Sequence, residues 1–214
     1  MLALIIPATF AQSGNHSIDT LVDLSRIASI ILLGLYALFL LFQLKTHSHL
    51  FVNSTHHEDE EASLTMKQAI ILLVTSTILV GVMAEFLVGS IEHSADALGW
   101  PPLFIGVILI PLFGNAAEHF TAVTVAGKNK MDLSIGIAIG SSTQVAVLIA
   151  PITVLIGWLL NVNMSLQFGL FETIATFVAV LIANSICSDG RSNWLEGAML
   201  LGTYSILAVS FWLA

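Results

Sequence analysis

One acidic side chain lies where the sequence is otherwise apolar and a charge is unexpected. Glu118 falls near the centre of the apolar segment 102–126, within the run Gly114–His119 (GNAAEH). An ionisable group at mid-bilayer costs about 2.5–3.5 kcal/mol on insertion scales, so its presence indicates a function. Asn115, Glu118 and Thr121 follow one another at intervals of three, which on a helix places three oxygen-bearing side chains on one face. We expect this face to bind a cation.

The next apolar segment carries neutral oxygen ligands that complement this carboxylate. In the run Gly140–Gln144 (GSSTQ), Ser141 and Gln144 are three residues apart and share a helix face. Hydroxyl and amide oxygens suit a hard cation such as Ca²⁺, which takes six to eight oxygen ligands. The same residue types also hold membrane helices together, so this set points to a cation site only in combination with Glu118.

Glu85 is a third acidic residue within an apolar segment, 66–91. It shares a four-residue spacing with small residues, namely Thr77, Gly81 and Gly89, and such a stripe favours contact with protein over contact with lipid. Both a functional and a packing role are consistent with this position. Glu172, close to the end of a later apolar segment, is interpreted as structural.

The elements that must hold these residues are membrane helices. Hydrophobic residues make up 57% of the 214-residue chain and charged residues 9%, and the mean hydropathy is +0.94. Soluble domains carry roughly 25% charged residues, so most of this chain must be solvated by lipid. Abundant Gly and Ala without sustained alternation favour helices over barrel strands. We predict an all-α integral membrane protein with six transmembrane helices, at 24–44, 66–91, 102–126, 133–160, 168–187 and 194–213.

The basic residues orient these helices. One side of the predicted bundle receives five of the six, namely Lys45, Lys67, Lys128, Lys130 and Arg191, whereas the other receives only Arg26. By the positive-inside rule the first side is cytoplasmic. The longest loop, 46–63, is rich in acidic residues and His and lies on that side. Both ends of the chain are then external or lumenal.

Several functions are excluded by what the sequence lacks. A net charge of −8 with no basic stripe argues against nucleic acid as a partner. The chain contains no H-E-x-x-H, no G-x-S-x-G and no nucleotide-binding glycine loop, so proteases, hydrolases and ATP-driven pumps lack their residues. We therefore predict no enzyme and no cofactor. A carboxylate in an apolar cavity holds its proton tightly, so protons and divalent cations compete for it, which is the chemistry of an exchanger.

The order and spacing of three motifs are similar to those of a known family. Gly114–His119, then Gly140–Gln144, then Asp189–Glu196 (DGRSNWLE) resemble the second half of the calcium/proton antiporters, the CAX family of cation exchangers. The acidic loop before the 66–91 segment also fits, as does Glu85. The resemblance covers nearly all of the chain. It implies a fold of two inverted repeats, each contributing one Gly-Asn-x-x-Glu helix to a calcium site at mid-membrane.

The resemblance also implies a role for each candidate residue. Glu118 would be the carboxylate that binds Ca²⁺ or H⁺ directly, while Asn115, Ser141 and Gln144 would complete or support the site. Glu85 and His119 would support the proton-coupled pathway. The cytoplasmic loop would gather cations through four consecutive acids, Glu58, Asp59, Glu60 and Glu61. Sodium-driven relatives usually carry an acidic residue at the position of Gln144, so this residue favours protons as the driving ion.

Only one of the two expected motifs occurs in this chain. We therefore predict the end of a preceding helix and one complete helix in 1–45, an acidic His-rich linker in 46–65, and a five-helix exchanger repeat in 66–214. The expected function is exchange of Ca²⁺, or a similar divalent cation, for H⁺. It needs a second repeat, which a partner half or a second copy supplies in trans or which belongs to a longer native chain; membrane lipid is the other partner. The expected location is a bacterial inner membrane. Exchange driven by Na⁺ or K⁺, and a non-transporting regulatory or scaffold subunit, are the alternatives.

Overall fold

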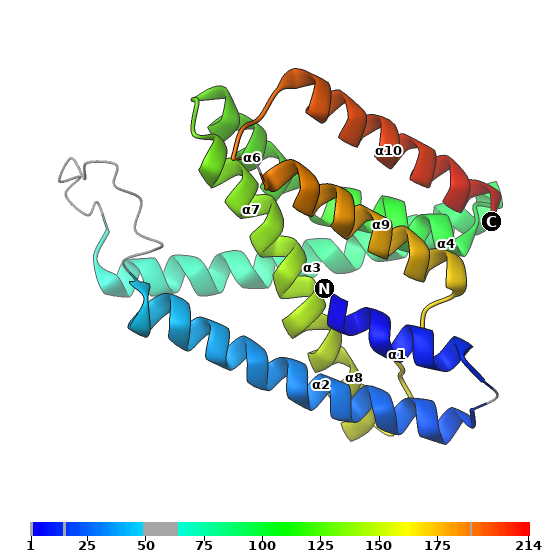
Figure 1. Cartoon of the computed structure of the whole chain (residues 1–214). Coiled ribbons are helices and arrows are strands. Elements are labelled where there is room, and N and C mark those ends of the chain that lie inside the picture. The colour runs from blue at the N-terminus through cyan, green and yellow to red at the C-terminus, as the bar shows by residue number, and fades with distance from the viewer. Residues whose placement is uncertain (1, 15, 49–63, 189) are drawn as a thin grey trace. The chain divides into compact units, whose positions relative to one another are not determined.

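The computed structural model describes residues 2–14, 16–48, 64–188 and 190–214, and all regular structure in these ranges is helical (Figure 1). The α-helices are α1 (Leu2–Gln12), α2 (Ile18–Leu41), α3 (Met66–Leu98), α4 (Pro102–Phe104), α5 (Ile110–Gly114), α6 (Ala116–Gly127), α7 (Met131–Gln144), α8 (Ala150–Leu159), α9 (Leu170–Cys187) and α10 (Trp194–Leu213). Three π-helical turns join or end them, namely η1 (Phe42–Thr46), η3 (Ile105–Leu109) and η4 (Val145–Ile149). The predicted all-α fold is confirmed.

The predicted membrane spans correspond to these helices. Five helical segments are long and apolar enough to cross a membrane, namely Ile18–Thr46, Met66–Ala95, Met131–Leu159, Leu170–Cys187 and Trp194–Leu213. The remaining predicted span, 102–126, is broken, because Pro102–Gly114 and Ala116–Gly127 meet at a bend of 55°. The chain is thus an integral membrane protein whose third predicted span is not a straight helix.

The helices form two compact units. Unit 1 contains Met1–Asn53 and Thr121–Gly197, and unit 2 contains Ser54–Phe120 and Ala198–Ala214. The three regions predicted along the chain, 1–45, 46–65 and 66–214, remain a prediction, since they divide the sequence by motif and not by packing.

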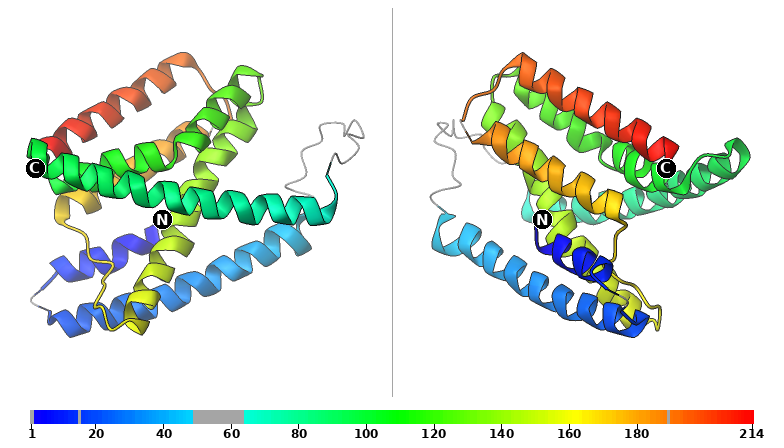
Figure 2. Two further views of the ribbon diagram at one scale, coloured as in Figure 1. Left: turned by 180° about the vertical axis from the view of Figure 1, so that it is seen from behind. Right: turned by 45° about the vertical axis from the view of Figure 1, so that its right-hand side comes forward.

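Unit 1 is organised around the contact between α2 and α8, which lie side by side in both views of Figure 2. The contacting face of α2 is made largely of small or branched residues, namely Leu21, Val22, Ser25, Ser29 and Leu32. On α8 the buried residues are Pro151, Val154 and Gly157. Small residues at a helix interface let two backbones approach closely, which is how helices associate where no water is expelled.

Ser25 joins α2 to the loop that follows α8. Its hydroxyl donates to the carbonyl of Leu21 at 2.7 Å and accepts from the backbone N–H of Leu166 at 2.9 Å. Ser25 and Leu166 are both buried. Ser25 therefore satisfies a backbone donor that the loop leaves unpaired, at a place where water does not reach it.

Removal of this hydroxyl is expected to destabilise unit 1. In Ser25→Ala the N–H of Leu166 loses its acceptor while still buried, at a cost of about 1–3 kcal/mol. Ser76→Ala is the control, because its hydroxyl donates only to the Leu72 carbonyl of its own exposed turn, at 2.7 Å. Thermal or denaturant unfolding of the two variants in detergent measures the difference, and equal losses would contradict the role of Ser25.

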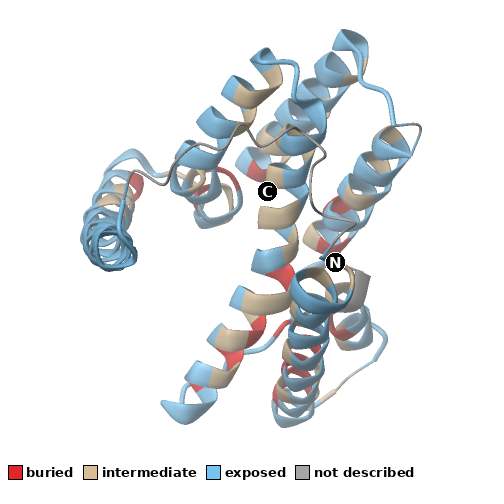
Figure 3. Cartoon of the chain, turned by 90° about the vertical axis from the view of Figure 1, so that its left-hand side faces the viewer, coloured by how far each residue is buried: buried red, intermediate tan, exposed pale blue. Residues whose placement is uncertain are grey.

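Unit 2 is held at one end by aromatic side chains. Trp212 of α10 packs edge-on against Trp100 and Phe104, with ring centroids 6.2 and 5.1 Å apart. Most of α3 is exposed, as is most of the ribbon in Figure 3.

The first turn of α3 is closed by a capping box. The Thr65 N–H donates to Gln68 Oε1, and the Gln68 N–H donates to Thr65 Oγ1.

The predicted start of the last helix is confirmed in detail. Asn193 Oδ1 accepts from the N–H groups of Leu195 and Glu196, both at 3.0 Å. The Glu196 carboxylate accepts in return from the N–H of Asn193 at 3.2 Å. These bonds satisfy amides that the first turn of α10 leaves free, so the motif has an architectural role.

Candidate cation site

Asn115 marks the break in the bent span. Its backbone (φ −99°, ψ 15°) leaves the helical region, and its N–H donates to the Pro111 carbonyl at 3.0 Å. Its own carbonyl accepts from the N–H of His119 at 2.9 Å, at the start of α6. The carbonyl end of α5 and the amide end of α6 therefore meet at this residue. Interrupted helices of this kind offer backbone dipoles to ions inside a membrane.

Glu118 lies in the first turn of α6, directly after the break. The positive end of a helix dipole stabilises a carboxylate there, which offsets part of the cost of a negative charge within a span. The Glu118 side chain is exposed, and neither it nor the half-buried Asn115 side chain hydrogen-bonds to a residue that the structure describes. Both polar groups are thus available to a ligand.

The predicted common face of Asn115, Glu118 and Thr121 requires a correction. The spacing assumed one continuous helix, whereas α6 begins only at Ala116 and Asn115 precedes it. The two helices on either side of Asn115 meet at a bend of 55°. Asn115 is therefore a candidate cation ligand at the helix break, and it does not belong to a stripe of side chains on one helix.

Ser141 and Gln144 lie at the end of α7 in unit 1. Ser141 is half-buried and Gln144 is exposed, and neither side chain hydrogen-bonds within the described part of the chain. Asn115 and Glu118 belong to unit 2. The four predicted ligands thus belong to different units, two in each.

A cavity of about 610 Å³ within unit 1 lies between α7 and α9. Its polar lining comes from five residues, namely Ser142, Thr143, Thr176, Asn184 and Cys187. Residues 141 and 144 do not line it, because Ser142 and Thr143 lie on a different face of α7. Sequence reasoning did not single out these cavity residues, although the eight-residue spacing of Thr176 and Asn184 on one apolar helix was a usable signal.

Glu85 and His119, the predicted supporting residues, both lie in unit 2 and are exposed. Glu85 is in the middle of α3, and a Cβ added at Gly81 or Gly89 would meet no described atom within 4 Å. The packing of its small-residue stripe against protein remains a prediction. No ion pair between Glu118 and His119 occurs among the described residues, as expected for neighbours about 100° apart on a helix.

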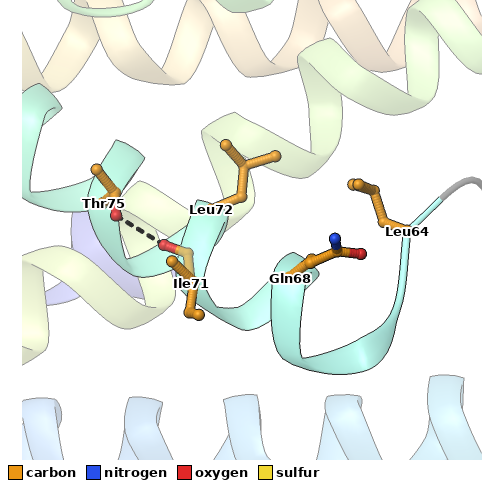
Figure 4. Close-up of a pocket in the computed structure, with 5 residues that line it drawn as sticks. All are labelled: Leu64, Gln68, Ile71, Leu72 and Thr75. Atoms are coloured by element: carbon orange, nitrogen blue, oxygen red, sulfur yellow. Dashed lines mark hydrogen bonds between the residues drawn. The ribbon is translucent and has the colours of Figure 1, made fainter.

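The four acids predicted to gather cations, Glu58, Asp59, Glu60 and Glu61, lie outside the described residues. The structure resumes at Leu64, where a shallow cavity of about 340 Å³ lies against the first turns of α3 (Figure 4). Its lining is mostly apolar, with Gln68 and Thr75 as the polar members, and Thr75 donates to the Ile71 carbonyl at 2.8 Å. This cavity holds no acidic group among its described lining residues.

The described residues do not form a complete metal site by themselves. Nowhere in the described ranges do three His, Cys, Asp or Glu side chains converge. A single carboxylate with amide and hydroxyl oxygens is a partial shell for a hard cation that prefers six to eight ligands.

Comparison with known proteins identifies the family. The family model described as "Sodium/calcium exchanger protein" matches residues 68–213, which include nearly all of α3 and all later helices. The chain belongs to this family. The segment it matches contains every predicted ligand, Asn115 and Glu118 as well as Ser141 and Gln144.

Relatives in bacteria and fungi are similar over almost the whole chain. A Ca(2+)/H(+) antiporter of Aphanothece halophytica is 43% identical over 99% of this chain and 61% of its own length. The Ca(2+)/H(+) antiporter ChaA of Bacillus subtilis is 41% identical, over 100% and 61%. A vacuolar calcium ion transporter of Schizosaccharomyces pombe is 38% identical, over 97% and 52%. The resemblance to calcium/proton antiporters is confirmed, and the chain spans about half to three-fifths of these relatives.

A solved structure supports the same assignment. The structure of native YfkE superposes with a TM-score of 0.78 at 37% identity, covering 99% of this exchanger-family chain and 59% of that protein. A selenium-substituted form, described as a Ca2+/H+ antiporter protein, gives the same TM-score. The helical membrane fold is therefore shared with a known transporter.

Proposed function

We propose that this chain is one part of a secondary transporter that exchanges Ca²⁺, or a similar divalent cation, for H⁺. The observation that carries the proposal is Glu118 in the first turn of α6, next to the helix break at Asn115. A carboxylate at such a break binds a hard cation or a proton but not both at once. The names of the relatives support the choice of ions.

The mechanism follows from that competition. With the site open to one side, a cation binds deprotonated Glu118 together with the amide oxygen of Asn115. Protonation of the carboxylate removes the charge that holds the cation, which then leaves. Ser141 and Gln144 supply neutral oxygens, and as neutral groups they do not bind protons themselves. Alternation of access between the two sides converts this exchange into transport.

A second exchanger half is proposed as the partner. The described residues offer one partial ligand shell, and the chain spans 61% of the bacterial relatives. The missing oxygens would come from an upstream half or from a second copy of this chain. The distribution of basic residues supports a cytoplasmic linker. The bacterial relatives favour a bacterial inner membrane. Glu85, His119 and the linker acids would assist proton transfer and cation entry.

The driving ion is the sharpest test of this proposal. Membrane vesicles that contain the chain together with an upstream half are expected to take up Ca²⁺ when a pH gradient is imposed. Because Gln144 is neutral, a sodium or potassium gradient of the same size should drive no uptake. Uptake driven by Na⁺ or K⁺ would identify the alternative exchanger class, and absence of uptake under every gradient would favour a non-transporting subunit.

A further inference from the structure

Two of the π-helical turns lie in the two spans that carry the predicted ligands. In η3 the N–H of Ile110 donates to the Ile105 carbonyl, and in η4 the N–H of Ala150 donates to the Val145 carbonyl. Each bond spans five residues instead of four, so each turn contains one residue more than an α-helical turn. The third turn, η1, closes with the His47 N–H on the Phe42 carbonyl at the end of α2.

A proline closely follows η3 and η4 but not η1. Pro111 stands six residues after Ile105, and Pro151 stands six residues after Val145. A proline ring clashes with the carbonyl four residues earlier and offers no N–H, and an extra residue in the preceding turn relieves this clash. A π-helical turn followed by a proline therefore occurs once in each ligand-bearing span.

The pattern of buried residues along the span Met131–Leu159 shows the effect of the extra residue in η4. The buried face of α8 contains Pro151 and Val154, and an uninterrupted α-helix would continue it backward through Val147 and Gln144. In the structure the buried residue is instead Ala146, while Gln144 is exposed. The packed face has thus moved by one residue across η4, which turns Gln144 away from α2.

In the other ligand-bearing span, the buried residues lie within the π-helical turn itself. Ile105 and Ile108 are buried in unit 2, and a regular helix would continue their face to residue 112 and then to Asn115. With the extra residue of η3, neither α5 nor α6 contains a buried residue. One inserted residue rotates the helix beyond it by about 100°, so Gln144 leaves the face that packs within its own unit, whereas Asn115, at the helix break, remains half-buried.

We propose that η4, held by Pro151, is a positioning segment that aims the ion ligand Gln144 away from the packed face of its span. Without the extra residue, Gln144 would be turned into a helix contact and lost to the cation. This inference rests on the proposed function. It predicts that removal of one residue from η4 misdirects Gln144.

The geometry can be tested without any transport assay. In a Cys187→Ser background, which removes the only cysteine, Gln144→Cys and Leu35→Cys carry spin labels on α7 and on the exposed side of α2. Deletion of Val147 is expected to rotate residue 144 toward α2, changing the label distance by on the order of 5–8 Å for a helix of this diameter. Deletion of Leu44 in η1 is the matched control and should leave it unchanged. An unchanged distance after deletion of Val147 would overturn the positioning role.

The consequence for the ion is measured in the complete exchanger. Deletion of Val147 should raise the Ca²⁺ concentration for half-maximal uptake at least about tenfold, because small misplacements of ligands are costly. The thermal midpoint, measured alongside, reports the cost of the restored proline clash. Deletion of Leu44 should alter neither quantity. Deletion of Leu148 shortens the same turn by one residue, so the proposal remains open to refutation if one deletion fails to fold. A moved label with unchanged Ca²⁺ affinity would overturn the link to the ion site, whereas failure of uptake in the unmodified exchanger would count against the proposed function alone.

Discussion

Glu118→Gln is expected to abolish proton-driven Ca²⁺ uptake while the protein still inserts and folds. The substitution keeps the size and one oxygen of the side chain but removes its charge and its proton. Removal of one partner of a buried ion pair costs about 3–5 kcal/mol, which corresponds to a loss of roughly 100-fold or more in affinity. A permanently neutral side chain also cannot alternate between Ca²⁺ and H⁺, so any residual Ca²⁺ binding should no longer depend on the protonation of this group.

Glu196→Gln is the matched control for this experiment. Glu196 is also an acidic residue at a helix start, but its carboxylate accepts from the N–H of Asn193 in a capping box, and a glutamine oxygen accepts equally well. Uptake of radioactive Ca²⁺ into vesicles under a pH gradient measures both variants, with membrane insertion checked in parallel. Normal uptake by Glu118→Gln would favour the non-transporting subunit over the exchanger.

Reconstitution of the chain alone is expected to give no Ca²⁺ uptake above background. One carboxylate, one amide and the neutral oxygens of α7 cannot supply the six to eight ligands that Ca²⁺ prefers. Addition of an upstream exchanger half during reconstitution should restore uptake, because a second ligand-bearing helix would then face Glu118 across the membrane centre. The measurement is uptake under a pH gradient in vesicles that hold, on average, fewer than one chain each.

The density of the chain in the vesicles separates the two candidate partners. If a second copy completes the site, uptake should appear as the chain density rises, with no upstream half present. If only an upstream half completes it, density should have no effect. Uptake by isolated single chains would contradict the need for any partner and would require that one chain enclose the cation by itself.

The sequence determined the helices and the ligand types, because these depend on local properties. Hydropathy over about 20 residues was sufficient to place the six spans, and the capping motif of Asn193 and Glu196 was recognisable from residue types at fixed spacing. The identity of Glu118 as an unexpected charge required only its position in an apolar segment. None of these features depends on the distant parts of the chain.

The tertiary structure decided the direction in which these residues point. A proline favours an irregular helix, but whether Pro111 or Pro151 produces a kink, a break or an extra residue depends on the segments that pack beside it. Ahead of α8 the outcome is buried Ala146 in place of Val147 or Gln144, and the neighbour α2 is distant in sequence. The hydrogen bond from Leu166 to Ser25 is likewise invisible in the sequence, since 141 residues separate its partners. Which residues of a helix face its neighbour, and which groups a long-range hydrogen bond joins, depend on contacts between distant segments. For that reason both are decided only in the folded chain.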